Sequence, residues 1–137
     1  MSKEKEIQEA VIKIRAIEQQ LPAIQQNIQS LNKILIETAT AINTLKETSK
    51  LEKETQTKTP IGSGVFITTK INKQENALIE VGEGVIVEKP IKEIMQTLEA
   101  REKDIQENIE KLTQTIEQME KDYYELAKKV QEYRQTN

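Results

Sequence analysis

The chain contains no cysteine, no histidine and no tryptophan among its 137 residues. Without cysteine it can form neither a disulfide framework nor a thiolate metal site. Without histidine it lacks the commonest general base and the commonest metal ligand of proteins. Carboxylates are abundant, but they occupy positions typical of solvent-exposed helix faces. We therefore expect a protein that is not an enzyme and that has no catalytic residues, no metal and no other cofactor.

Long hydrophobic runs and blocks of like charge are also missing. The chain has no run of about 18 apolar residues, and its start, MSKEKEIQEA, lacks the hydrophobic stretch of a signal peptide, so we expect a cytoplasmic protein. The 20 basic and 23 acidic residues are interspersed and give a net charge of −3. Because nucleic acids and anionic membranes both attract basic patches, we expect neither of them as a partner.

What the chain does have is two long series of apolar residues, spaced alternately three and four positions apart. Such spacing over about six heptads is typical of coiled-coil helices, which we expect over residues 3–50 and 91–135. The first series is Ile7, Ala10, Ile14, Ile17, Leu21, Ile24, Ile28, Leu31, Leu35, Thr38, Ile42 and Leu45. The second is Ile91, Met95, Leu98, Glu102, Ile105, Ile109, Leu112, Ile116, Met119, Tyr123, Leu126, Val130 and Tyr133.

Proline marks two points of these helices. Pro22 falls inside the first series, where it removes one backbone donor and crowds the preceding turn. The series stays in register on both sides of it, so we expect one helix with a kink or local loosening and not a break. Pro90 precedes the second series, and we expect the second helix to begin just after it.

All four glycines lie between the two series, as two Gly-x-Gly units in PIGSGVFI and EVGEGVIV. Glycine permits the tight turns and positive φ angles that reverse a strand. We therefore expect two β-hairpins in a segment that we call the hub, residues 57–89. The expected strands cover residues 57–61, 64–72, 77–82 and 85–89. The expected turn glycines are Gly62, Gly64, Gly82 and Gly84.

The hub carries more apolar residues than it can bury by itself. The stretches 65–67 and 85–87 are apolar on both faces, so both faces should be covered. About 30 residues are too few to cover them alone. We therefore expect the hub to assemble with other copies or other chains. The candidate assembly residues are Ile61, Val65, Phe66, Ile67, Ile71, Leu78, Ile79, Val81, Val85, Ile86 and Val87.

An even number of strands returns the chain to the side it left, so the two helices should lie antiparallel. The registers fit this arrangement: pairs such as Ile7 with Val130 and Ala10 with Leu126 continue from the chain ends to the hub without a gap. Equal helix lengths favour a hairpin within one chain. Pairing of each helix with a copy of itself uses the same seam, and the sequence does not exclude it.

Each series contains one polar residue, Thr38 in the first and Glu102 in the second. A polar residue in a seam can fix the pairing register at a cost in stability. Alternatively, these are tolerated residues, with a long side chain that reaches out to solvent. We favour the second interpretation.

The hub resembles one protein family, the α class of prefoldin subunits. Its members carry Val-Pro-(Ile or Val)-Gly, and then Val-Gly-x-Gly-Val ahead of a Glu-Lys pair. The corresponding residues here are Thr59-Pro60-Ile61-Gly62, Val81-Gly82-Glu83-Gly84-Val85 and Glu88-Lys89. Thr59 departs from the usual apolar residue. The resemblance extends over essentially the whole chain and implies a single prefoldin-like domain over residues 1–137.

The resemblance also implies a function. Prefoldin is an ATP-independent chaperone, a hexamer of two α-class and four β-class subunits. The implied fold is mainly α, a long antiparallel coiled-coil hairpin joined by two short β-hairpins that assemble into an oligomeric β-barrel. The tips of the coiled coils would hold unfolded client proteins and pass them to a group II chaperonin.

Apolar residues beyond the seam gather near the chain ends, at the expected tip. Three of the four aromatic residues lie in the last fifteen, and Val11 and Ile12 lie opposite them. Surplus exposed apolar surface marks interaction sites, and chain ends that fray can adapt to many clients. The candidate client-binding residues are Ile7, Val11, Ile12, Ile14, Tyr123, Tyr124, Leu126, Val130 and Tyr133. The alternative is that Tyr123 and Tyr133 only fill the seam and that Tyr124 is an ordinary surface residue.

Three further isoleucines, Ile34, Ile36 and Ile94, lie off the seam near the hub, and we expect them to pack against it or against a neighbouring subunit. A rival function is a structural scaffold or filament subunit that binds a folded partner along its helices. Phosphate binding is disfavoured, since neither Gly-x-Gly unit continues into a nucleotide-binding motif or precedes a helix.

Overall fold

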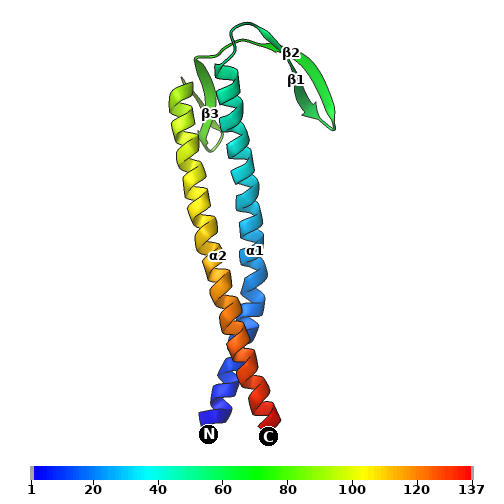
Figure 1. Ribbon diagram of the computed structural model, residues 1–137, viewed down its shortest axis with the longest axis vertical. Coiled ribbons are helices and arrows are strands. Elements are labelled where there is room, and N and C mark those ends of the chain that lie inside the picture. The colour runs from blue at the N-terminus through cyan, green and yellow to red at the C-terminus, as the bar shows by residue number, and fades with distance from the viewer. Residues whose placement is uncertain (1, 137) are drawn as a thin grey trace. The chain divides into compact units, whose positions relative to one another are not determined.

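The computed structural model describes residues 2–136 (Figure 1). Two long helices are joined by two small antiparallel hairpins, which confirms the predicted fold class. The elements are α1 (Ser2–Ser49), β1 (Thr55–Gly62), β2 (Val65–Ile71), β3 (Asn76–Gly82), β4 (Val85–Pro90) and α2 (Ile91–Thr136). Each strand begins and ends within two residues of the position that the sequence predicts.

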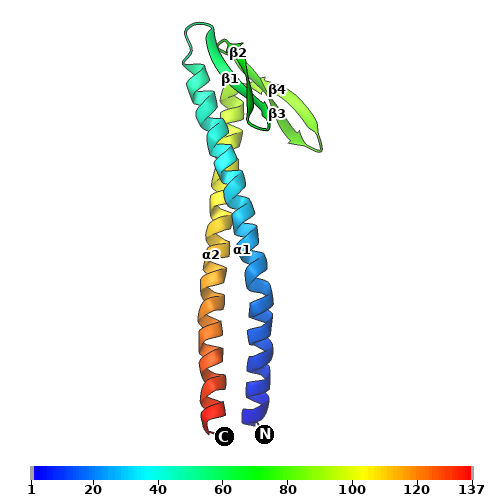
Figure 2. The ribbon, with the colours of Figure 1, turned by 90° about the vertical axis from the view of Figure 1, so that its right-hand side faces the viewer.

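The contacts divide the chain into two compact units, which are described separately. The coil unit contains the residues up to Leu35 and those from Asp104 onward, and the hub unit is Ile36–Lys103. In the coil unit, α1 and α2 lie side by side and antiparallel, with the two chain ends close together (Figure 2). Helix α1 continues through Pro22, as the uninterrupted register predicts.

The seam of the coil unit is closed most tightly at the tip. Ile7, Ala10 and Val130 are buried there, and Val11, Ile14, Leu126 and Tyr133 pack against them. We call these seven residues the tip cluster. The seam residues from Ile17 to Leu35 are half-buried, because a two-helix seam has no further layer to cover it. The shared cluster of Ile7 with Val130, and of Ala10 with Leu126, matches the register predicted for a hairpin within one chain.

This closed tip differs from the frayed ends that the sequence suggested. Helix α1 is continuous from Ser2, and α2 continues to Thr136. The physical reason is that the first and last seam residues find partners on the other helix, with Ala10 only 3% exposed. Terminal residues fray when no tertiary contact holds them, and here such a contact exists.

The hub unit has its own core, formed where the helices meet the second hairpin. Ile42, Ile94 and Leu98 are buried, and Ala77 and Ile79 of β3 pack against them with Leu45 and Met95. Ile94 is only 3% exposed, so it packs against the hub as predicted. A backbone hydrogen bond also fixes the start of α2 to the residue that precedes β3. The amide of Ile91, which has no acceptor within its own helix, donates to the carbonyl of Glu75 at 2.9 Å.

The two polar seam residues differ in burial. Thr38 is 9% exposed, whereas Glu102 is half-buried and retains access to solvent. Across residues 2–136, every buried side-chain nitrogen or oxygen has a hydrogen-bond partner. Glu102 therefore fits the interpretation of a side chain that reaches solvent. Burial of Thr38 leaves no side-chain polar atom without a hydrogen-bond partner.

The two hairpins are built alike, with equivalent residues 20 positions apart. In each, the register shifts just before the turn, between Pro60 and Gly62 and between Glu80 and Gly82, so that Ile61 and Val81 are extra residues of a β-bulge. Positive φ at Ser63 and Gly64, and at Glu83 and Gly84, gives the turn that joins twisted antiparallel strands. The repeated Gly-x-Gly motif is thus a repeated turn geometry.

Candidate interaction surfaces

Most of the predicted assembly residues of the hub are exposed in the isolated chain. Eight of them have between 46% and 71% of their surface accessible: Ile61, Val65, Phe66, Ile67, Leu78, Val81, Val85 and Ile86. The other three, Ile71, Ile79 and Val87, are half-buried. Each sheet has only two strands, so every strand has an open edge. Exposed apolar side chains beside open strand edges are features of an assembly interface.

The predicted tip residues fall into two groups. Ile12 and Tyr124 are 66% and 70% exposed, and Tyr123 is 38% exposed. Ile7 and Val130 are buried in the tip cluster, where Val11, Ile14, Leu126 and Tyr133 are half-buried. The first group is accessible while the two helices are in contact. The second group becomes fully accessible only when the helices separate.

Two polar contacts join the helices of the coil unit beside these residues. The hydroxyl of Tyr123 donates to Oε1 of Glu18 at 3.2 Å, and Nζ of Lys129 donates to Oε1 of Glu6 at 2.9 Å. The hydrogen bond to Glu18, together with the negative charge of this carboxylate, raises the pKa of Tyr123. Sequence reasoning missed Glu6 and Glu18. The sequence does contain a signal for Glu6. Glu6 directly precedes the seam residue Ile7, and Lys129 directly precedes Val130, the seam residue that is paired with Ile7.

The ion pair at the tip predicts a pH dependence. The hydrogen bond from Lys129, and then its charge, lower the pKa of Glu6 below its ordinary value of 4.5. Because the folded state prefers the ionised carboxylate, the contact stabilises the closed tip above the unfolded pKa. This stabilisation is lost as the pH falls through the lowered pKa. An NMR titration of the Glu6 carboxyl should show the lowered pKa, and Lys129→Gln should return it to the ordinary range; an unchanged value in that variant would contradict the assignment.

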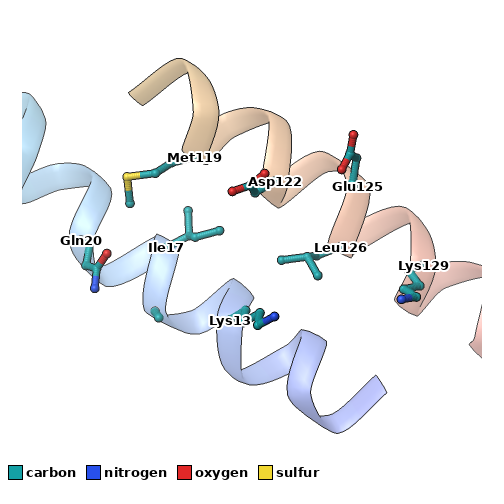
Figure 3. Close-up of a pocket in the computed structure, with 9 residues that line it drawn as sticks. Lys13, Ile17, Gln20, Met119, Asp122, Glu125, Leu126 and Lys129 are labelled. Atoms are coloured by element: carbon teal, nitrogen blue, oxygen red, sulfur yellow. The ribbon is translucent and has the colours of Figure 1, made fainter. Parts of the chain in front are cut away.

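Shallow grooves run along the coil unit beside the seam. One of them has a volume of about 590 Å³. Figure 3 shows Ile17, Met119 and Leu126 pointing into the space between the helices, with charged and polar side chains at the rim. The rim residues are Lys13, Gln20, Asp122, Glu125 and Lys129. Ala16, also in the lining, is small and leaves the groove open. Ile17, Met119 and Leu126 on the floor of this groove add accessible apolar surface next to the tip.

The structure offers no other kind of site in the part of the chain that it describes. Among residues 2–136, no group of three or more acidic side chains is placed to hold a metal ion. Neither α1 nor α2 combines the length and hydrophobicity required to cross a membrane. The prominent surfaces are therefore the apolar strands of the hub unit and the end of the coil unit.

Known proteins share this arrangement. Residues 17–136 match the family of prefoldin subunits. Prefoldin subunit alpha of Pyrococcus horikoshii is 33% identical over 132 residues, which cover 96% of this chain and 89% of that relative. Prefoldin subunit alpha of Archaeoglobus fulgidus is 28% identical over 108 residues, 79% of each chain. A cryo-EM structure of filamentous PFD from Methanocaldococcus jannaschii has the same fold, with a TM-score of 0.70 at 22% identity over 88% of this chain and 97% of that one.

These findings agree with the resemblance of the hub motifs. The match extends over both helices and both hairpins, and it supports a chaperone-type role within a prefoldin complex. A role in such a complex is also consistent with a chain that is not an enzyme. The chain belongs to the prefoldin family, and α subunits of archaeal prefoldins are among its relatives.

Proposed function

We propose that this chain is a subunit of an ATP-independent cytoplasmic chaperone, which holds unfolded polypeptides and transfers them to a group II chaperonin. The observation that carries the proposal is the match to the prefoldin family over residues 17–136, since it includes the whole hub, all of α2 and about two thirds of α1.

The hub unit supplies assembly. Two copies of this chain join four β-class subunits, and the hairpins of all six close into a β-barrel. The eight exposed apolar residues of β1 to β4 support this proposal, because a chain that stayed alone would leave them in water. The open edges of both two-stranded sheets support it further, since barrel closure provides partners for the unpaired backbone groups.

The coil unit supplies client binding at its tip. Ile12 and Tyr124 contact a client first, because both are exposed while the tip is closed. The residues of the tip cluster add apolar area once the helices separate. Separation must break the buried contacts of Ile7, Ala10 and Val130, whereas the exposed ion pair between Glu6 and Lys129 adds little resistance. An interface that needs apolar area but no fixed shape suits unfolded chains of many sequences.

Substitution of the exposed tip residues tests this role. In the double variant Ile12→Ser with Tyr124→Ser, binding of an unfolded client should weaken about tenfold or more, since each apolar side chain contributes on the order of 1 kcal/mol. The measurement is suppression of the aggregation of a denatured protein by the assembled complex. Ile36→Ser is the matched control, because Ile36 is 67% exposed, as Ile12 is at 66%, but lies in the hub unit. Equal loss of activity in both variants would contradict a role of the tip.

The rival function is a scaffold that binds a folded partner along its helices. It is favoured by the fold shared with a PFD from Methanocaldococcus jannaschii that is described as filamentous. Deletion of residues 123–137 separates the two functions. A holdase would lose its clients, whereas a scaffold would keep its partner and its filaments.

A further inference from the structure

Pro22 interrupts the backbone hydrogen bonding of α1 without ending the helix. The helix extends from Ser2 to Ser49, with Pro22 inside it. Proline has no amide hydrogen, and in a helix that hydrogen would bond to the carbonyl four residues earlier. The carbonyl of Glu18 therefore lacks its helical donor, and the proline ring crowds it. Relative to alanine, a proline at an interior position shifts the equilibrium against the helix by a factor of about 100.

The same proline would be well placed in a helix that begins at residue 22. The first amides of a helix have no helical acceptors, so proline loses nothing there, and its fixed φ suits the first position. A break between Leu21 and Pro22 thus leaves a regular helix from Pro22 to Ser49. The amides from Gln26 onward keep their acceptors in this shorter helix, because the acceptor of Gln26 is the carbonyl of Pro22. Pro22 therefore favours a break of α1 at this point.

Packing between the helices is also looser beside Pro22 than at the tip. A hollow of about 290 Å³ lies next to it, lined by Ile17, Glu18, Leu21, Pro22, Glu120 and Tyr123. The seam residues Ile17 and Leu21 are half-buried, whereas Ala10 in the tip cluster is only 3% exposed. Segments open most readily where few buried contacts hold them. The missing hydrogen bond and the weak packing thus coincide in one turn of α1.

The residues before Pro22 are held against α2 at a few places. Near the chain end, the tip cluster packs residues of this segment against those of α2. Glu6 accepts a hydrogen bond from Lys129, and Glu18, next to the proline, accepts one from the hydroxyl of Tyr123 at 3.2 Å. Helices in proteins owe most of their stability to such packing, so a segment that lost these contacts would also unwind.

We propose that Pro22 is a hinge at which the tip opens: Ser2–Leu21 separates from α2 as one segment, while α1 from Pro22 onward stays helical. Separation exposes the apolar side chains that the tip cluster buries, so the proline sets how often they become accessible. The hydrogen bond between Tyr123 and Glu18 opposes this opening, because it ties the last turn of the segment to α2. The hinge is a property of the fold alone, whereas its use in client binding rests on the proposed function.

Amide hydrogen exchange of the assembled complex tests the hinge. In the parent chain, the amides of residues 12–21 should exchange as one group, about tenfold or more faster than those of residues 26–35. Pro22→Ala should slow this group about 100-fold and leave residues 26–35 unchanged. Pro22 is exposed, so the substitution removes no buried side chain. Tyr123→Phe keeps the ring but removes the hydroxyl, and it should speed exchange of the group about fivefold.

A second variant moves the proline by one helical turn. Pro22→Ala with Gln26→Pro keeps one proline in α1, and Gln26 is exposed on the same face of the helix as Pro22. The boundary of the fast-exchanging group should move with the proline, from residue 22 to residue 26. Unchanged exchange in Pro22→Ala, or a boundary that stays at residue 22 in the double variant, would overturn the hinge.

Suppression of aggregation by the same complexes tests whether clients use the hinge. Because apparent affinity falls with the population of the open state, Pro22→Ala should raise the concentration for half-maximal suppression about threefold or more. The variant with the moved proline should restore it. Slower exchange with unchanged suppression would leave the hinge standing and refute client binding by the tip cluster. A parent complex that suppresses no aggregation would instead refute the proposed function.

Discussion

Replacing Val65, Ile67 and Val85 with glutamate should dissolve the assembly of this chain while most of its helical content remains. The three side chains are 51%, 46% and 54% exposed in the isolated chain, so the substitutions cost little before assembly. In a closed hub each glutamate would be buried without a partner, at a cost of several kcal/mol per charge. The helices should persist because the coil unit has its own buried cluster, independent of the strands.

The structure makes this experiment selective. Val87 is left unchanged, because it is half-buried and its loss would disturb the chain itself as well as the assembly. A triple control with the same added charge places glutamate at exposed positions: Ser63, Asn72 and Gln74. Ser63 accepts glutamate because Glu83, its equivalent in the second hairpin, has the same φ of 51°.

Native mass spectrometry of the complex and circular dichroism give the two readouts. We expect the control to assemble and the strand variant to appear as single chains with nearly unchanged helicity. Persistent assembly of the strand variant would show that the strands are not the interface. A collapse of helicity would show that the helices fold only within the assembly, and the hairpin within one chain would then lose its support.

The sequence predicts the elements of this fold well because their signals are local. The three-and-four spacing extends through Pro22, and the structure keeps one helix there. Positive φ at Gly62 and Gly82, and the turns that follow them, account for the two Gly-x-Gly units. Such patterns depend on a few neighbouring residues and on no distant contact, so both helices and all four strands are found near the predicted positions.

Which apolar residues are covered is harder to predict, since it depends on distant partners. Ile7 and Ile12 are five positions apart, yet Ile7 is 8% exposed and Ile12 is 66% exposed. In β3 the neighbours Leu78 and Ile79 differ in the same way, because only Ile79 faces the core of the hub unit. Alternation along a strand shows that two faces exist, but it does not show which face meets the helices.

The three off-seam isoleucines also differ in burial, although their sequence positions look alike. From the sequence, Ile34, Ile36 and Ile94 share one expected role near the hub. In the structure Ile34 is 47% and Ile36 67% exposed, whereas Ile94 is 3% exposed among Ile42, Leu98 and the side chains of β3. The difference arises because Ile94 lies in the first turn of α2, whose start is tied to Glu75 just before β3.

Ile94→Ala should therefore destabilise the hub unit by about 2–4 kcal/mol, since it removes buried methylene groups and leaves a cavity between the helices and the second hairpin. Ile36→Ala removes the same atoms from an exposed position and should cost less than about 0.5 kcal/mol. Denaturant unfolding of both variants measures the difference, and amide hydrogen exchange should show faster exchange in β3 and β4 for Ile94→Ala alone. Equal effects of the two substitutions would mean that the second hairpin does not rest on α2.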